Sequence, residues 1–178
     1  MQRAPIFLLT GTPGSGKSSV ARALLQRFEF GLHLPVDDLR EFVVSGIAHP
    51  IPTLTEETGR QFRLARESAA MTAKLYATNG FAVVIDDVIS SDDVSSMFEP
   101  ALNEFDFHKI LLQPRLEVAL ERNRTRTNKN FDPSFLEEPI RQIHAWMSAQ
   151  ELPKDWLRID SSQLNLEQTV DAILELSR

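Results

Sequence analysis

Apolar residues occur along the chain in two alternating patterns, and each pattern predicts one kind of element. Short, nearly continuous apolar runs are typical of strands in a parallel sheet. Longer segments in which apolar residues recur every three or four positions are typical of helices. The short runs predict five strands, over residues 6–10, 32–36, 81–85, 108–112 and 156–159. The periodic segments predict helices over residues 17–28, 39–48, 55–79, 92–105, 115–126, 133–150 and 166–176.

This alternation of strands and helices predicts an α/β fold with a mainly parallel sheet between helices. Residues 81–85 are all apolar, as expected for a central strand that is covered on both faces. Pro35 cannot donate a backbone hydrogen bond, so the strand over 32–36 is expected at an edge of the sheet. Ligands of such sheets bind beyond the carboxyl ends of the strands, and the residues that follow each strand are therefore the candidates for function.

Three details refine the predicted helices. Asn79 and Gly80 provide a stop for the long helix, and Pro100 predicts a bend or break in the helix over 92–105. Pro50 and Pro52 predict a loop over residues 49–54. The buried face of the long helix is expected to consist of Phe62, Ala65, Ala69, Ala73 and Tyr76.

A phosphate-binding loop is the most specific motif in the chain. Residues 11–18 read GTPGSGKS and match G-x-x-x-x-G-K-[ST] at every fixed position, between a predicted strand and a predicted helix. Backbone N–H groups in such a loop point inward at an anion, and the following helix adds its positive end. Lys17 is expected to reach the β- and γ-phosphates, and Ser18 to place its hydroxyl on Mg²⁺. The predicted nucleotide-binding residues are Gly11, Thr12, Pro13, Gly14, Ser15, Gly16, Lys17, Ser18 and Ser19.

Two pairs of carboxylates follow predicted strands. Asp37 and Asp38 come after the second strand, where a carboxylate can accept a proton from a substrate hydroxyl and orient it for attack on the γ-phosphate. Asp86 and Asp87 end the third strand in the Walker B pattern, in which a carboxylate holds Mg²⁺. We assign Asp86 to Mg²⁺ and place Asp38 and Asp87 on the acceptor side. For both pairs the alternative is a role in a turn or a helix cap.

The most basic stretch follows the fourth predicted strand. Residues 115–129 contain five basic and two acidic side chains, in a chain whose formal net charge is -6. Arg122 and Arg126 are four positions apart and share a helical face, where they repel each other unless an anion lies between them. We predict a lid whose arginines clamp the transferring phosphoryl group. The alternative is a solvated helix face.

A second group of arginines lies along one side of the long helix. Arg60, Arg63 and Arg66 follow at intervals of three residues. Glu67 can pair with Arg63 on the surface, since the two residues are four apart. The alternative, which we adopt for Arg63, is that this side chain faces the acceptor substrate.

Composition excludes several other functions. The 178 residues contain no cysteine, which excludes disulfides, thiol nucleophiles and zinc held by cysteine. The acidic net charge makes nucleic acid an unlikely partner, because binding the phosphate backbone usually needs a broad basic surface. The first apolar run is too short for a signal-peptide core or a membrane span, so we expect a cytoplasmic protein that has no membrane partner. Its oligomeric state is not determined by these patterns.

With these motifs in order, the chain resembles the small P-loop kinases of the shikimate and gluconate kinase type, and most of all the chloramphenicol phosphotransferase family. The resemblance rests on GTPGSGKSS, on VDDL after the second strand, on FRLA in the long helix and on VVIDDV at the third strand. It implies a three-layer P-loop fold with strand order 2-3-1-4-5. It also implies that Asp37 is the catalytic aspartate and that Arg63 contacts the substrate, and it places Arg122, Arg124 and Arg126 in the lid.

The sequence therefore predicts an ATP-dependent kinase that uses Mg²⁺ and phosphorylates a hydroxyl group of a small molecule. Its catalytic residues are predicted to be Lys17, Asp37, Arg122 and Arg126, and Arg122 is also expected to contact the nucleotide. We expect one domain over residues 1–178, with a lid over 115–135 and an acceptor side over 37–80. The alternatives are a regulatory nucleotide-binding protein, a GTPase-like switch and a nucleoside or polynucleotide kinase. The switch would need N-K-x-D at a strand end, and residues 128–131 fail at the last position.

Overall fold

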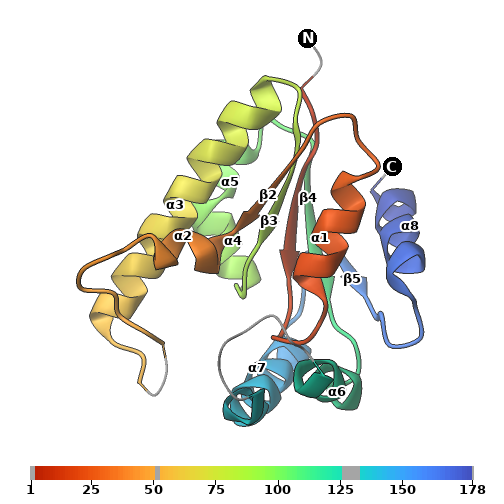
Figure 1. The fold of residues 1–178 in the computed structure, drawn as a ribbon. Helices are drawn as coiled ribbons and strands as arrows, with labels where there is room; N and C mark the ends of the chain where they lie inside the picture. The colour runs from red at the N-terminus through yellow and green to blue at the C-terminus, as the bar shows by residue number, and fades with distance from the viewer. Residues whose placement is uncertain (1–2, 51–52, 126–132, 178) are drawn as a thin grey trace.

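Five parallel strands form one sheet in the order β2-β3-β1-β4-β5 in the computed structural model, which describes residues 3–50, 53–125 and 133–177 (Figure 1). The predicted α/β class and strand order are confirmed, and Pro35 lies on an edge strand as expected. The strands are β1 Ile6–Thr10, β2 Gly31–Pro35, β3 Ala82–Asp86, β4 Phe107–Leu112 and β5 Trp156–Ile159.

Helices connect the strands and cover both faces of the sheet. In the described ranges no helix has both the length and the apolar character that crossing a membrane requires. The helices are α1 Lys17–Leu25, α2 Val36–Glu41, α3 Glu56–Thr78, α4 Ser91–Met97, α5 Glu99–Leu102, α6 Leu116–Thr125, the 3₁₀ helix η1 Pro133–Leu136, α7 Glu137–Ala149 and α8 Leu166–Leu176.

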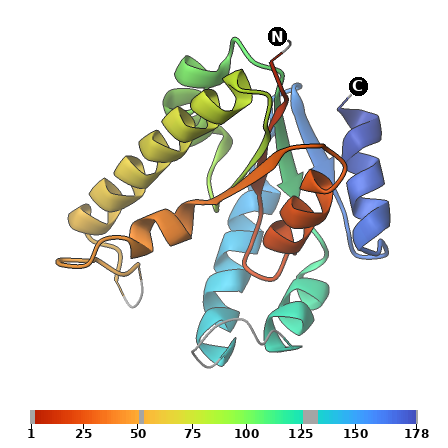
Figure 2. The ribbon, with the colours of Figure 1, turned by 45° about the horizontal axis from the view of Figure 1, so that its top comes forward.

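Alternate residues of the central strands build two separate cores. Ile6 and Leu8 of β1 point to the face that is covered by α3, α4 and α5. Phe7 and Leu9 point to the opposite face, where they pack against α1 and α8. Figures 1 and 2 show these two groups of helices on opposite sides of the sheet. Because β1 and β3 are fully buried, their apolar runs are continuous rather than alternating.

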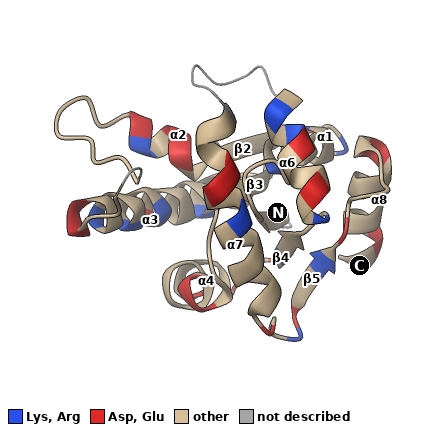
Figure 3. Cartoon of the chain, turned by 90° about the horizontal axis from the view of Figure 1, so that it is seen from below, with Lys and Arg blue, Asp and Glu red and all other residues tan. Residues whose placement is uncertain are grey.

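The carboxyl ends of the strands meet at one end of the molecule, opposite to both chain termini (Figure 1). Helix α2 extends from the end of β2, and α6 and α7 lie beneath the ends of the central strands. A small third core of Ala119, Leu120 and Ile140 holds α6 against α7. Figure 3 looks onto this end and marks acidic residues on α2.

The short helix after β2 differs from the prediction. The sequence predicted a helix over 39–48, whereas α2 spans Val36–Glu41. It begins earlier because Asp37 and Asp38 lie in its first turn, where their negative charges stabilise the positive end of the helix. It ends earlier because β-branched valines follow at 43 and 44, and Gly46 adopts a positive φ of 78°.

Two other helical predictions need smaller corrections, and a third is confirmed. Helix α1 ends at Leu25 rather than at Phe28, because the chain tightens there into turns such as Phe28 N–H to Leu25 O, 3.2 Å long. The break that Pro100 predicted in the helix over 92–105 is confirmed, since this segment forms two helices, α4 and α5. Tyr76 is exposed, and Ala77 continues the buried face of α3 in its place.

Thr10 joins the end of β1 to the segment that follows β3. Its buried hydroxyl donates to the Ile89 carbonyl, 2.9 Å away, and accepts from the Ile89 N–H at 3.0 Å. Thr10→Val keeps the shape of the side chain but leaves both backbone groups without this partner. We expect it to lower the free energy of unfolding by about 2–3 kcal/mol, measured by urea denaturation. Thr10→Ser keeps the hydroxyl, so its free energy of unfolding should fall by less than that of Thr10→Val. An equal decrease in both variants would contradict the role of these hydrogen bonds.

Candidate active site

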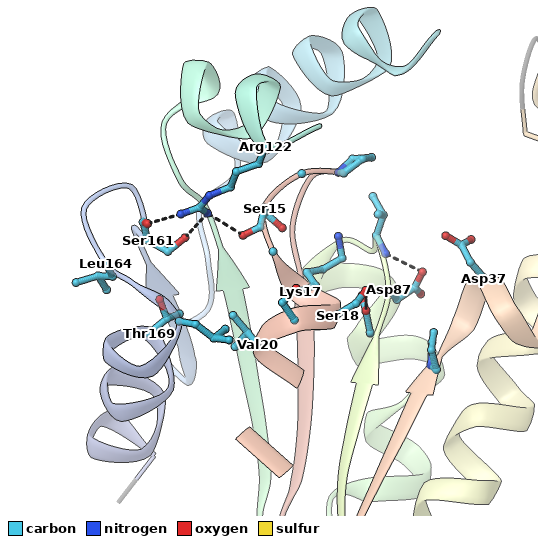
Figure 4. Close-up of a pocket in the computed structure, with 18 of the residues that line it drawn as sticks. Ser15, Lys17, Ser18, Val20, Asp37, Asp87, Arg122, Ser161, Leu164 and Thr169 are labelled. Atoms are coloured by element: carbon cyan, nitrogen blue, oxygen red, sulfur yellow. Dashed lines mark hydrogen bonds between the residues drawn. The ribbon is translucent and has the colours of Figure 1, made fainter. Parts of the chain in front are cut away.

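A cavity of about 570 Å³ opens at the carboxyl ends of the strands. Its walls come from the phosphate-binding loop, the start of α2, the end of β3, α6, and the connection from β5 into α8. Figure 4 shows Arg122 and Asp37 on opposite sides of this cavity, with Lys17 and Ser18 between them. The cavity therefore brings together most of the residues that the sequence singled out.

The phosphate-binding loop depends on glycine at two points of close approach. A Cβ atom on Gly11 would collide with the Leu112 carbonyl of β4, and one on Gly14 would collide with the Ala119 carbonyl of α6. Gly14 also has a φ of 83°, which L-residues with side chains rarely adopt. The loop thus lies directly against the backbone of α6, and this contact orients its N–H groups.

Lys17 lies in the first turn of α1, with its amine over the loop. Its Nζ donates to the Gly11 carbonyl at 2.8 Å and to the Thr12 carbonyl at 3.1 Å. The side chain is buried, so the positive charge stays within the loop rather than in solvent. A phosphate placed in the loop would meet this amine together with the positive end of α1.

Ser18 and Asp86 form the oxygen pair that a magnesium ion would need. The Ser18 hydroxyl donates to Asp86 Oδ2 over 2.6 Å, and His33 Nε2 of the neighbouring strand lies 3.4 Å from the same oxygen. Burial by itself raises the pKa of Asp86, but the contacts with His33, Lys17 and Ser18 outweigh it and the pKa is lowered. An ionised carboxylate beside a hydroxyl fits Mg²⁺, which takes few protein ligands and keeps several waters.

Asp87 lies beside this pair but has a different partner. Arg66 Nε of α3 donates to Asp87 Oδ2 over 2.7 Å, and the Val88 N–H donates to Asp87 Oδ1 over 2.7 Å. Burial raises the pKa of Asp87, while the charge of Arg66 and these hydrogen bonds oppose the increase. Arg63, which the sequence assigned to the substrate, is exposed on α3 and is absent from the cavity lining among the described residues. Arg66 is therefore the arginine of α3 that reaches this end of the sheet.

The start of α2 places two carboxylates on the cavity. Asp37 and Asp38 both line it, and the Asp37 side chain is 63% exposed. Arg40, one turn later, lies 3.7 Å from Asp37 Oδ1 and donates to the Ala48 carbonyl over 2.7 Å. Gln61 of α3 accepts from the Ala48 N–H, and it thereby ties the segment after α2 to the long helix.

The ring of Phe62 lies against two arginines, each of which contacts a carboxylate of the cavity. The guanidinium carbon of Arg40 lies 3.9 Å from the centre of the Phe62 ring, and that of Arg66 lies 5.2 Å from it. Each arginine also contacts a carboxylate of the cavity, Asp37 or Asp87. The series Asp37–Arg40–Phe62–Arg66–Asp87 therefore links α2, α3 and the end of β3. We call these five residues the aromatic clamp.

Of the arginines predicted for the lid, Arg122 is the one that contacts the phosphate-binding loop among the described residues. It donates to the Ser15 carbonyl at 3.3 Å, and to the hydroxyl and carbonyl of Ser161 at 3.2 and 2.9 Å. Arg124 instead points to η1 and α7, where it pairs with Glu137 over 2.7 Å. Arg126 and residues 128–131 lie outside the described part of the chain.

Sequence reasoning missed one whole wall of the cavity. This wall follows β5 and contains Ser161, Leu164, Asn165, Leu166 and Thr169. The position of these residues after a predicted strand could have indicated a role in the site, but they form no recognisable sequence motif. The sequence also missed His33, Arg40 and Phe62, because their roles depend on contacts between separate elements.

Phe62 is expected to hold α2 in place through its ring. Phe62→Leu keeps an apolar side chain but removes both stacking contacts, each worth about 0.5–2 kcal/mol. Backbone amides of α2 should then exchange with solvent deuterium roughly ten times faster, because 1.4 kcal/mol corresponds to a factor of ten in an equilibrium. Phe62→Tyr keeps the ring and should leave exchange unchanged. Equal exchange in both variants would show that the ring does not hold α2.

A comparison with curated proteins finds the bifunctional enzyme CysN/CysC of Rhodopirellula baltica. The two sequences are 26% identical over 176 residues, which is 98% of this chain. The chain spans only 26% of the length of that relative.

Solved kinase structures share the fold over almost the entire chain. The Mycobacterium tuberculosis APS kinase CysC in complex with AMPPNP and APS superposes with a TM-score of 0.67 and 17% identity, covering 99% of this chain and 98% of that one. A gluconokinase from Sinorhizobium meliloti gives a TM-score of 0.60 with 15% identity, covering 99% and 95%. At these identities the likeness concerns the fold alone.

The family comparison is more specific. Residues 6–153 match the AAA_33 family, described as an AAA domain. The predicted resemblance to P-loop kinases is confirmed by this match and by the kinase structures, whereas the narrower likeness to chloramphenicol phosphotransferase stays a prediction. Because the match covers most of the chain, the protein belongs to the AAA_33 family of P-loop, kinase-like domains.

Proposed function

We propose that the protein is an ATP-dependent phosphotransferase that phosphorylates a hydroxyl group of a small molecule. One observation carries the proposal: a phosphate-binding loop and an exposed aspartate face each other across one cavity. Lys17 and Ser18 lie on the donor side, and Asp37 lies opposite them (Figure 4). A protein that only binds nucleotide has no need for an exposed aspartate, such as Asp37, opposite the phosphate-binding loop.

On the donor side, the loop and Lys17 hold the β- and γ-phosphates. Ser18 and Asp86 would hold Mg²⁺, which supplies charge neutralisation at the phosphate oxygens when it is bound. The nucleoside end of ATP is assigned to the wall that follows β5, where Leu164, Leu166 and Thr169 offer a partly apolar surface. Arg122 lies between this wall and the loop, and its planar guanidinium suits both a phosphate and the face of a base.

On the acceptor side, Asp37 orients the substrate hydroxyl and takes its proton. The acceptor oxygen forms a bond to the γ-phosphorus while the bond between that phosphorus and the leaving oxygen of ADP breaks. The proton of the hydroxyl passes to the carboxylate of Asp37. Arg40 lies 3.7 Å from this carboxylate and helps to direct it. The lid over 115–135 is proposed to exclude water, which competes with the acceptor for the phosphoryl group.

The comparisons support this proposal at the level of the family and the fold. The mycobacterial kinase that superposes on this chain is named as a complex with the nucleotide AMPPNP. Two alternatives remain, a regulatory nucleotide-binding protein and a nucleoside or polynucleotide kinase. A screen of hydroxyl compounds with γ-³²P-ATP separates them, because a regulatory protein labels no compound and a polynucleotide kinase labels nucleic-acid ends.

Lys17→Ala tests the donor side. We expect ATP turnover to fall by at least about a hundredfold, because the variant loses a preorganised positive charge at the phosphates. Thermal unfolding should show that the fold is kept. Arg22→Ala removes an exposed arginine from the same helix and serves as the control, which should keep full turnover. Full turnover by Lys17→Ala would exclude the proposed donor site.

Asp37→Asn tests the acceptor side. The amide cannot take the proton, so phosphorylation of any acceptor found in the screen should fall by roughly 10²–10⁴-fold. Affinity for ATP, measured by calorimetry, should be unchanged because Asp37 contacts only the acceptor. Glu41→Gln removes an exposed carboxylate from the same helix and should have no effect. Normal phosphorylation by Asp37→Asn would transfer the role of base to Asp38.

A further inference from the structure

Acidic side chains outnumber basic ones among the described residues of the cavity lining. Among the described residues that line it, the acidic ones are Asp37, Asp38, Asp86 and Asp87. The basic ones are Lys17 and Arg122, and both lie over the phosphate-binding loop. The positive charge of the cavity is thus concentrated where the phosphates of ATP belong.

Two arginines beside the acceptor side, Arg66 and Arg40, are already engaged by the protein. The Arg66 side chain is only 12% exposed and donates to Asp87 at 2.7 Å and to the Val88 carbonyl at 3.2 Å. The Arg40 side chain is only 6% exposed, lies against Phe62 and donates to the Ala48 carbonyl. Neither guanidinium is part of the cavity lining, so neither presents its charge to a substrate.

The reaction itself needs only two of these carboxylates, Asp37 as the base and Asp86 at the metal. The charge of Asp87 is balanced by Arg66. Asp38 is left as an exposed carboxylate that the chemistry does not require. A negative group on the acceptor would face this residue and Asp37. A charge pair about 4 Å apart changes affinity by between roughly fivefold and a thousandfold, according to how well water screens it.

On the basis of the proposed kinase activity, we infer that the acceptor is an alcohol without negative charge, and that a protonated amine near the reacting hydroxyl strengthens its binding. Asp38 is the residue that sets this preference, since its carboxylate attracts the ammonium group and repels a carboxylate or phosphate. The phosphate-transfer step is unchanged, because the amine takes no part in bond making or breaking.

Charge-matched sets of alcohols test the inference on the complete chain. We would assay glycerol, serinol and glycerate, then glucose, glucosamine and glucuronate, with Mg²⁺ and γ-³²P-ATP. In each phosphorylated set, kcat/KM should be highest for the amine and at least about tenfold lower for the acid than for the neutral alcohol. A set in which the acid is the best substrate would overturn the inference. Failure to label any alcohol by a chain that binds ATP would instead contradict the proposed function.

Asp38→Asn tests the residue. The preference for the amine over the neutral alcohol should shrink toward one, while kcat/KM for the neutral alcohol changes much less. Asp92→Asn, which neutralises an exposed aspartate on α4, should leave the preference unchanged. An undiminished preference in Asp38→Asn would show that Asp38 does not set it.

A binding experiment that needs no known acceptor completes the test. With Mg²⁺ and AMPPNP occupying the donor side, sulfate at constant ionic strength should give no saturable rise in the melting temperature. A saturable rise would reveal an anion site on the acceptor side and would overturn the inference.

Discussion

The hydrogen bond from Ser18 to Asp86, 2.6 Å long, joins two residues that are 68 positions apart in the chain. It forms because β1 and β3 are adjacent and parallel, with Leu9 paired to Asp86, so that both strands end at the same edge of the sheet. The phosphate-binding loop begins where β1 ends, and Asp86 is the last residue of β3. Asp37 and Asp87 also follow strands that end at this end of the sheet, and both line the same cavity.

Burying the carboxylates of Asp86 and Asp87 at the end of β3 costs free energy, and their contacts offset this cost. A buried carboxylate without a partner is strongly destabilising, whereas one that accepts hydrogen bonds from a cation is tolerated. Asp87 has Arg66 and the Val88 N–H, and Asp86 has Ser18 and His33. The aromatic clamp connects this region to α2, because Phe62 contacts both Arg66, which pairs with Asp87, and Arg40, which lies 3.7 Å from Asp37.

Charge is distributed unequally across the cavity. Lys17 and Arg122 lie over the phosphate-binding loop, and of the carboxylates only Asp86 pairs with that loop's serine among the described residues, whereas Asp37, Asp38 and Asp87 lie away from it. The two halves come from different parts of the fold: the basic half from α1 and α6, and the acidic half from α2 and the end of β3. Arg122 of α6 and Asp37 of α2 lie on opposite sides of the cavity, so that groups of opposite charge can be held within it (Figure 4).

Local sequence determined the elements and the donor side of the site. The strands over 6–10 and 156–159 and the helix over 166–176 have the predicted bounds, because their apolar patterns are strong and their ends carry clear stop signals. Residues 11–18 specify a phosphate-binding loop by themselves, since its conformation depends on glycines and on the helix that directly follows.

Only the tertiary structure decided which contacts each member of a candidate set makes. The sequence assigned Asp86 to Mg²⁺ and Asp87 to the acceptor side from their order alone, and packing turns Asp86 toward Ser18 and Asp87 toward Arg66. It favoured Arg63, but this residue and Arg66 differ by about 60° around the helix axis, and only Arg66 meets β3. Contacts between α2, α3 and the sheet edge make these distinctions. They depend on residues far apart in the chain, which no local pattern of the sequence records.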